Sequence, residues 1–258
     1  MNSVVGMTPG RELAGRVALV TGGARNIGRA IARALAAGGA SVMVNANTSR
    51  AEAEETVAMI RQGGGSAAMH VCDVTDAAAV ARMVAVTVQE FGRLDMLVNN
   101  AAVRVETPFA QIALDEWRHV ISTVLDGAFI CTQACLPHLQ SAGGGSVVNI
   151  GGMTGHKGAL ARTHVVTAKA GLAGMTKALA LDLAPYHVTV NCVVPGQIAT
   201  QRGLPGAPPV PEHRLAGPPI GRRGAPEEIA AMVRMLCGPD ARYITGQSIH
   251  VNGGGLMP

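Results

Sequence analysis

Short apolar runs alternate with amphipathic stretches along almost the whole chain. The runs that we interpret as strands are RVALVT (16–21), SVMVN (41–45), AAMHV (67–71), DMLVN (95–99), SVVNI (146–150), VTVNCVV (188–194) and SIHVN (248–252). The stretches between them carry apolar residues at helical spacing, as in residues 27–37 and 51–62. Apolar strands that alternate with helices predict a parallel sheet covered on both faces. Because such crossovers are right-handed, we expect an α/β fold with a doubly wound, Rossmann-type sheet.

This pattern fits a single domain. A chain of 258 residues is long enough for one α/β domain with a full core, and it is short for two. We expect an N-terminal arm over residues 1–14 and one domain over residues 15–258.

One segment interrupts the alternation of strands and helices. Residues 197–226 include QRGLPGAPPVPEHRLAGPPIGRRGAP (201–226), which is too rich in proline and glycine for a helix or a central strand. Long loops at the carboxyl ends of parallel strands commonly cover a ligand. We therefore predict a substrate lid here rather than a plain linker, because a helix and a strand of the same domain follow it.

Composition narrows the range of functions. Hydrophobic residues make up 48% of the chain but never 18 in succession, so we expect no transmembrane helix. The first residues, MNSVVGMTPGREL, lack the features of a signal peptide. The net charge of +4 comes from scattered residues, and 2% aromatic residues offer little surface on which bases could stack. We therefore expect no nucleic-acid partner.

The cysteines add no metal or disulfide signature. All five stand outside any CxxC pair and outside any disulfide-rich pattern. We interpret them as reduced, buried thiols of a cytoplasmic protein, and we expect no metal site.

A glycine-rich turn joins the first strand to the first helix in VALVTGGARNIGRAIA (17–32). Gly22 and Gly23 suit this turn because glycine tolerates positive φ and lets backbone approach a pyrophosphate. Gly28 lets the helix pack close to the strand. The first turn of the helix offers N–H groups and a positive dipole end to a phosphate. The strand, turn and helix together predict a dinucleotide-binding site.

Further motifs follow in the order found in one known family. The turn TGGARNIG, the segments CDVTD (72–76), VNNAA (98–102) and VNCVVPGQIAT (190–200), and YITGQSIHVNGG (243–254) resemble motifs of the short-chain dehydrogenase/reductase family. The resemblance runs from about residue 15 to residue 254 and implies a nicotinamide-dependent oxidoreductase. The residues that the turn and the resemblance place at the cofactor are Gly22, Gly23, Arg25, Asn26, Ile27, Gly28, Asn47, Ser49, Arg50, Asp73, Val74, Asn100, Ala101, Lys169, Pro195, Gly196, Ile198 and Thr200.

Two of the matching motifs depart from the family pattern. Asn26 stands where the turn has its middle glycine, and Ala102 stands where N-N-A-G has its last residue. Asparagine is the non-glycine residue that best tolerates left-handed backbone geometry, so we expect the turn to survive.

The end of the second strand favours NADP(H) over NAD(H). A carboxylate there would bind a ribose 2′-hydroxyl and repel a 2′-phosphate, but Ala46 stands near that position. Arg25 and Arg50 offer bidentate contacts to a phosphate, and Asn47 and Ser49 offer further hydrogen bonds.

The catalytic residues of the family are mostly absent. The resemblance implies a tyrosine that transfers the substrate proton, a lysine four residues later, a serine that polarises the substrate oxygen, and an asparagine. Here Lys169 is retained, whereas Val165, Gly152 and Val124 occupy the tyrosine, serine and asparagine positions. Neither of the two tyrosines is followed by a lysine four residues later.

Three residues are candidate substitutes for the lost groups. His156 lies in the expected loop after the fifth strand, Thr154 is two residues beyond the missing serine, and His164 precedes the missing tyrosine. Histidine has a pKa suited to proton transfer near neutrality. However, His164 and Lys169 are five residues apart on a helix, a rotation of roughly 140°, so His164 should point away from the site. We interpret Lys169 itself as a ribose ligand.

Three functions remain open on these grounds. The chain is an oxidoreductase of a small carbonyl or alcohol whose proton comes from water, His156 or His164. Alternatively it binds NADP(H) without redox catalysis, as a sensor or a partner subunit, or it is a lyase or hydrolase that uses the same pocket. The resemblance also implies a homotetramer or homodimer formed through helices near residues 117–139 and 167–183.

Overall fold

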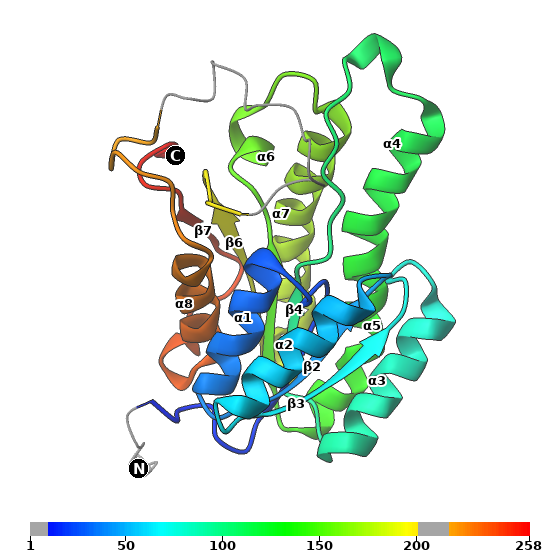
Figure 1. The fold of residues 1–258 in the computed structure, drawn as a ribbon, viewed down its shortest axis with the longest axis vertical. Coiled ribbons are helices and arrows are strands. Elements are labelled where there is room, and N and C mark those ends of the chain that lie inside the picture. The colour runs from blue at the N-terminus through cyan, green and yellow to red at the C-terminus, as the bar shows by residue number, and fades with distance from the viewer. Residues whose placement is uncertain (1–9, 201–216) are drawn as a thin grey trace.

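The computed structural model describes residues 10–200 and 217–258, and they form a seven-stranded parallel sheet (Figure 1). The strand order is β3-β2-β1-β4-β5-β6-β7. The strands are β1 (Val17–Val20), β2 (Ser41–Ala46), β3 (Ser66–Val71), β4 (Met96–Asn99), β5 (Gly145–Ile150), β6 (Val188–Pro195) and β7 (Ser248–Val251). The predicted doubly wound sheet is confirmed, and each predicted run overlaps one strand to within a residue at either end.

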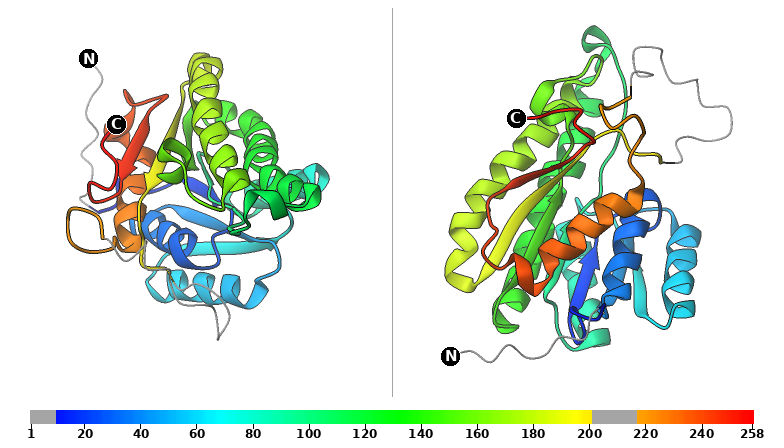
Figure 2. Two further views of the ribbon diagram at one scale, coloured as in Figure 1. Left: turned by 90° about the horizontal axis from the view of Figure 1, so that it is seen from above. Right: turned by 90° about the vertical axis from the view of Figure 1, so that its left-hand side faces the viewer.

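Helices cover both faces of the sheet, as the views from two further sides show (Figure 2). One face carries α1 (Asn26–Ala37), α2 (Arg50–Gln62) and α8 (Pro226–Cys237), and the other carries α3 (Ala77–Phe91), α5 (Gly127–Ser141) and α7 (Thr163–Leu183). The remaining elements are α4 (Leu114–Ile121), the π-helical turn η2 (Ser122–Asp126), α6 (Thr154–Lys157), and the 3₁₀ turns η1 (Phe109–Gln111), η3 (Ala184–Tyr186) and η5 (Pro239–Ala241).

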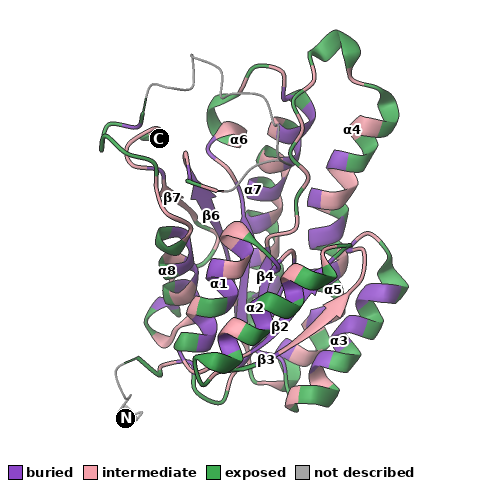
Figure 3. Cartoon of the chain, viewed as in Figure 1, coloured by how far each residue is buried: buried purple, intermediate pink, exposed green. Residues whose placement is uncertain are grey.

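Burial follows the alternation of strands and helices. Every residue of β1 and β4 is buried, and the helices carry their buried residues on the face toward the sheet (Figure 3). One apolar core lies between the sheet and α1, α2 and α8, and a second lies between the sheet and α3, α5 and α7. Strands covered on both faces must be apolar throughout, which is why their sequence shows runs rather than alternation.

Part of the predicted arm is packed onto the domain. Leu13 is fully buried, and its N–H donates to the carbonyl oxygen of Gly38 at 2.9 Å. Glu12 accepts hydrogen bonds from the guanidinium of Arg234 on α8. The packed domain therefore begins before residue 15, while residues 1–9 lie outside the described residues.

Helices α4, η2 and α5 form one continuous helix over residues 114–141. It is long and apolar enough to cross a membrane by length and composition only, a test that core helices of globular domains also pass. In this structure it packs against α3 and α7.

A line of buried polar side chains connects strands β4 and β5 to helix α7. Asn99 donates to Asn149 Oδ1 at 2.9 Å, and Asn149 Nδ2 donates to Thr176 Oγ1 at 2.9 Å. The Thr176 hydroxyl then donates to the Leu172 carbonyl oxygen at 2.8 Å. Because buried amides without partners are costly, this network sets the position of α7 against the sheet.

We predict that Thr176→Val destabilises the domain by about 1–3 kcal/mol, because valine keeps the shape of threonine but leaves the Asn149 amide without its acceptor. Urea unfolding followed by circular dichroism measures the change in the free energy of unfolding. Thr167→Val is the matched control, since Thr167 is exposed on the same helix, and it should change that free energy by less than about 0.5 kcal/mol. Equal effects of the two substitutions would contradict the role of the network.

Candidate functional site

The glycine turn lies between β1 and α1, where the order of the strands reverses. Strand β1 pairs with β2 on one side and with β4 on the other, so the carboxyl ends of β1 and β4 form the switch point at which sheets of this kind bind ligands. Gly22 has φ +59°, and Asn26 has φ +50°, in the left-handed region. Asparagine therefore takes the backbone conformation for which the family pattern has glycine, as expected.

Gly28 brings helix α1 close to the turn. A Cβ at this position would clash with the Gly22 carbonyl oxygen and would lie 2.6 Å from Asn100 Nδ2. Arg25, the N-cap residue of α1, makes no side-chain capping hydrogen bond. This cradle fits the pyrophosphate of a dinucleotide.

Asn100 clamps the turn from the end of β4. Its Nδ2 donates to the carbonyl oxygens of Thr21 at 3.0 Å and Gly22 at 2.9 Å, and its backbone N–H donates to Thr21 Oγ1 at 2.9 Å. The N–H of Ala101 donates to the same hydroxyl. The side-chain amide of Asn100 therefore shapes the turn, although the sequence predicted it as a cofactor contact.

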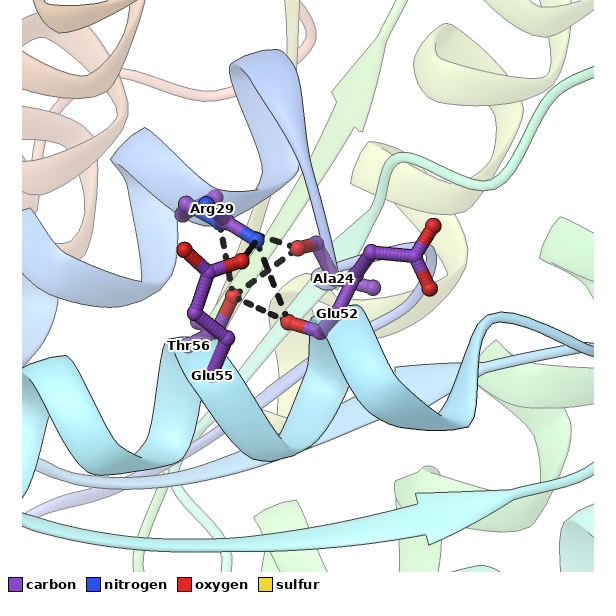
Figure 4. Close-up of polar contacts among 5 residues, drawn as sticks. All are labelled: Ala24, Arg29, Glu52, Glu55 and Thr56. Carbon is purple, nitrogen blue, oxygen red and sulfur yellow. Dashed lines mark hydrogen bonds and ion pairs between the residues drawn. The ribbon is translucent and has the colours of Figure 1, made fainter.

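Two residues that the sequence analysis missed also hold the turn. Asn45, which is buried on β2, accepts a hydrogen bond from the Gly22 N–H at 3.2 Å. Arg29 on α1 donates to the Ala24 carbonyl oxygen and to Thr56 Oγ1 on α2 (Figure 4). A polar residue inside an apolar strand is the signal that could have identified Asn45.

Arg29 also connects the turn to the first residues of α2. Its guanidinium donates to the Glu52 carbonyl oxygen and pairs with the Glu55 carboxylate at 2.6 Å (Figure 4). Thr56 donates to both the Ala24 and the Glu52 carbonyl oxygens at 2.9 Å. These bonds hold the amino end of α2, with Ser49 and Arg50, at a set place beside the turn.

The residues predicted around the adenosine lie on the loops after β1, β2 and β3. Arg25 is exposed in the turn, and Arg50 is exposed at the start of α2, 3.9 Å from Glu54. Asn47 donates to Asp73 Oδ2 at 3.2 Å, and hydrogen bonds from Thr75 lower the pKa of the Asp73 carboxyl group. The loop thus presents two cations and a carboxylate that stays ionised.

Three further predicted contacts lie close to these loops. Ile27 follows Asn26 in the first turn of α1 and packs against the core. Val74 is buried next to Asp73, and its side chain packs so closely against Gly127 that a Cβ on Gly127 would clash with it. Ala102 is exposed at the end of the VNNAA motif, so its methyl group adds no strain to the core.

The loop after β6 carries the other predicted cofactor contacts. Gly196, next to Pro195, approaches β7 so closely that a Cβ would lie 2.6 Å from Asn252 Cα. Ile198 is buried, and the N–H of Ala199 donates to the Gly224 carbonyl oxygen at 2.8 Å. This hydrogen bond joins the loop after β6, which is described as far as Thr200, to the segment that contains Gly224. Residues 201–216 of the predicted lid lie outside the described residues.

Lys169 lies at the carboxyl end of β5. Its Nζ donates to the Ile150 carbonyl oxygen at 2.6 Å, and the side chain remains partly exposed. Burial lowers the pKa of Lys169 to about 8, and the nearby Cys192 thiol opposes that shift. Lys169 also borders Gly152, where an added Cβ would lie 3.7 Å from Lys169 Cγ and 3.8 Å from Thr154 Oγ1. The two side chains therefore flank a space beside Gly152.

The positions where the resemblance expects a tyrosine and an asparagine belong to one apolar cluster. Val165 and Val124 are 6% and 2% exposed, and they pack with Val120, Ala168 and Leu172. The partly buried residues Val103, Val105, Ile121, Leu125 and Met175 pack against this cluster. The region next to Lys169 is therefore aliphatic on the side of α4 and η2.

The two candidate histidines differ in their surroundings. His164 is fully buried, and its Nε2 lies 2.9 Å from Glu116 Oε1 on α4. It is thus held against α4, in line with its rotation from Lys169 along α7. His156 lies on α6, a short helix where the sequence indicated a loop, and its ring meets His250 edge-on at 4.7 Å. Gly155 allows α6 to form here because it packs directly against the backbone of α7.

No group of three or more histidine, cysteine, aspartate or glutamate residues within 10–200 and 217–258 is arranged to hold a metal ion. The five cysteines are free thiols, four of them buried. A cavity of about 410 Å³, lined in part by Arg16, Arg93 and Arg242, opens at the amino ends of the strands, at the sheet edge opposite to Lys169.

Comparison with known proteins places this site in a family. The family described as Enoyl-(Acyl carrier protein) reductase matches residues 22–255. The chain is 39% identical over 251 residues to a 3-oxoacyl-[acyl-carrier-protein] reductase of Synechocystis sp., covering 95% of this chain and 98% of the relative. It is 39% identical over 252 residues to the short-chain reductase protein NovJ of Streptomyces niveus, covering 92% and 93%.

A solved structure agrees with this result. A double mutant of a Serratia marcescens short-chain dehydrogenase/reductase superposes with a TM-score of 0.88 at 36% identity, covering 95% of this chain and 99% of the other. The chain therefore belongs to the short-chain dehydrogenase/reductase family, and it is an oxidoreductase of that type.

We predict that Gly28→Ala abolishes detectable binding of NADPH, because the new methyl group pushes α1 away from the Gly22 carbonyl oxygen. Fluorescence titration with NADPH measures the binding, and a thermal melt should show a loss of about 1–3 kcal/mol in stability. Gly174→Ala is the control, since a Cβ at Gly174 on α7 meets nothing within 4 Å. NADPH binding by a folded Gly28→Ala protein at the original affinity would contradict the role of the cradle.

Proposed function

We propose that the protein is an NADP(H)-dependent reductase of a small carbonyl compound, with a proton donor other than tyrosine. The observation that carries this proposal is Lys169, whose ammonium group is held at the end of β5 and whose Cγ borders Gly152. An ammonium group there would stabilise negative charge that develops on a substrate oxygen bound next to it. The turn, Asn100 and the loop after β6 supply a cofactor site on the same edge of the sheet.

The chain's residues fit a dinucleotide with a 2′-phosphate. The close contact between Gly28 and Gly22 forms the pyrophosphate cradle, and the exposed guanidinium groups of Arg25 and Arg50 would hold the 2′-phosphate. Asn47 and Ser49 would add hydrogen bonds, and Lys169 would bind the ribose of the nicotinamide. Bound NADPH would supply the hydride.

A 3-oxoacyl thioester is the substrate class that the relatives favour. Several proteins with 37–39% identity to this chain are named 3-oxoacyl-[acyl-carrier-protein] reductases. The apolar cluster with Val124 and Val165 gives the site an aliphatic wall on one side, which suits an acyl chain. We also propose a cytoplasmic homotetramer or homodimer, which the family resemblance supports.

A second function is favoured by the same apolar cluster. Val124 and Val165 stand where the family resemblance implies an asparagine and a tyrosine that take part in proton transfer. Aliphatic side chains at these positions cannot transfer a proton. The alternative is a protein that binds NADP(H) without catalysis and serves as a sensor or as a partner of an active subunit. Lys169 would then be only a ribose ligand.

The assay for the first function is oxidation of NADPH at 340 nm with an N-acetylcysteamine 3-oxoacyl thioester, and with small ketones and aldehydes. We expect turnover of at least one of these substrates, slower by about 10²–10⁴-fold than in an enzyme with a tyrosine acid. Tight binding of NADPH without any oxidation over the whole panel would exclude the reductase and favour the non-catalytic protein.

We predict that Arg25→Ala and Arg50→Ala each weaken NADPH binding by about tenfold or more and leave NADH binding within about twofold, because each removes a charge-assisted contact to the 2′-phosphate. Fluorescence titration with both nucleotides gives the dissociation constants. Arg61→Ala, at the far end of α2, is the control. Equal losses of NADH and NADPH affinity would contradict the proposed phosphate contact.

A further inference from the structure

The strongest unassigned feature is the space beside Gly152. A Cβ at this position would sit in ordinary van der Waals contact with Lys169 Cγ and Thr154 Oγ1. The space therefore lies between α6 and α7 at the carboxyl end of β5, and no side chain of residue 152 occupies it.

Lys169 has donors left for an oxygen in that space. A lysine ammonium has three N–H donors. Among residues 10–200 and 217–258, the hydrogen bond to the Ile150 carbonyl oxygen is the one that Lys169 makes. That bond anchors Nζ at the end of β5 while its other N–H groups stay available. Thr154 Oγ1 lies across the space and can donate a further hydrogen bond.

The other polar groups around Lys169 are neutral or engaged elsewhere. Cys192 on β6 is the neighbour that interacts electrostatically with Lys169, and burial raises the pKa of its thiol, so it stays uncharged. His156 on α6 packs against His250, and Lys157 is exposed. Glu116 on α4 is turned to His164.

Asp126, in the π-helical turn, lies next to Leu125, whose side chain packs against Gly171. The remaining wall is the aliphatic cluster of Val124 and Val165. Within the described part of the chain, Lys169 is therefore the ionisable side chain that a Cβ added at Gly152 would contact within 4 Å.

We propose that Lys169 donates the proton to the substrate oxygen directly, with that oxygen bound in the space beside Gly152 between Lys169 Nζ and Thr154 Oγ1. This inference rests on the proposed reductase function. It makes Lys169 a catalytic residue and makes Thr154 a residue that binds and orients the substrate.

The step balances without any further reactant. Bound NADPH would supply a hydride that forms a C–H bond to the carbonyl carbon as the C=O π bond breaks, and the oxygen would take a proton from Lys169 Nζ. The products would be the alcohol, NADP⁺ and a neutral Lys169 amine. Because the Lys169 side chain is partly exposed, the amine would regain its proton from water.

Burial supports this role because it lowers the pKa of Lys169 to about 8. At neutral pH the group is protonated, yet it releases a proton far more readily than an exposed lysine. Reduction requires the protonated form, so the rate should be constant below pH 8 and should fall about tenfold per pH unit above it.

The test uses two substitutions of Lys169 in the full-length protein. Lys169→Arg keeps a cation for the ribose and for the Ile150 carbonyl oxygen, but an arginine does not release its proton. We expect NADPH binding within about threefold of the parent protein and a loss in kcat of about 10²-fold or more. Lys169→Ala should lose kcat similarly and regain at least about tenfold on addition of ethylamine. Lys177→Ala, an exposed lysine on α7, should match the parent protein.

A measurement without cofactor or substrate accompanies these assays. The chain has three lysines, Lys157, Lys169 and Lys177, and two of them are exposed. Nitrogen-15 NMR titration of the cofactor-free protein should show one lysine side chain titrating near pH 8. The signal near pH 8 should vanish in Lys169→Arg.

The outcomes separate the proposal from the function on which it rests. If the parent protein oxidises NADPH with none of the carbonyl substrates, the reductase function is excluded. If the parent protein turns over a carbonyl substrate and Lys169→Arg is equally fast, the reductase function stands and Lys169 is not the proton donor. The same conclusion follows if Lys169→Ala is slow and ethylamine does not restore its rate. The absence of any lysine signal that titrates near pH 8 would overturn it as well.

Discussion

The hydrogen bonds from Asn99 through Asn149 to Thr176 are the interaction on which the site depends. They join the ends of two central strands to the middle of α7, in a region without access to water. A slip of α7 by one residue would break them and leave buried amides without partners, at a cost of about 1–3 kcal/mol each. Lys169 lies two helical turns before Thr176, so its reach to the Ile150 carbonyl oxygen follows from this register.

Most of the fold can be predicted from the chain because its signal is local. An apolar run followed by an amphipathic stretch marks each strand and helix, and a glycine turn between a strand and a helix marks the cofactor cradle. The left-handed backbone of Asn26 also follows from the residue type. Contacts between distant residues carry no such local signal. Glu12 pairs with Arg234 across 222 residues, and Arg29 connects α1 with α2 through bonds that no spacing in the sequence indicates.

The sequence predicts the cofactor half of the candidate site more directly than its catalytic half. The glycines and exposed arginines can be assigned to a cofactor site from their residue types and their places in the motifs. The effect of a missing side chain, in contrast, depends on which residues surround that position in the folded protein. In the sequence Gly152 is only a missing serine, whereas in the structure it borders Lys169 and Thr154. Likewise His164 is a plausible acid by residue type, but folding buries it against Glu116.

The packing of Val124 and Val165 limits which single substitutions the protein tolerates. Both lie in the same aliphatic cluster, so asparagine at position 124 or tyrosine at position 165 would place a polar group among methyl groups. Burying such a group without a hydrogen bond costs about 1–3 kcal/mol in proteins. A polar side chain at either position is therefore compatible with this packing only if a hydrogen-bonding partner is introduced with it.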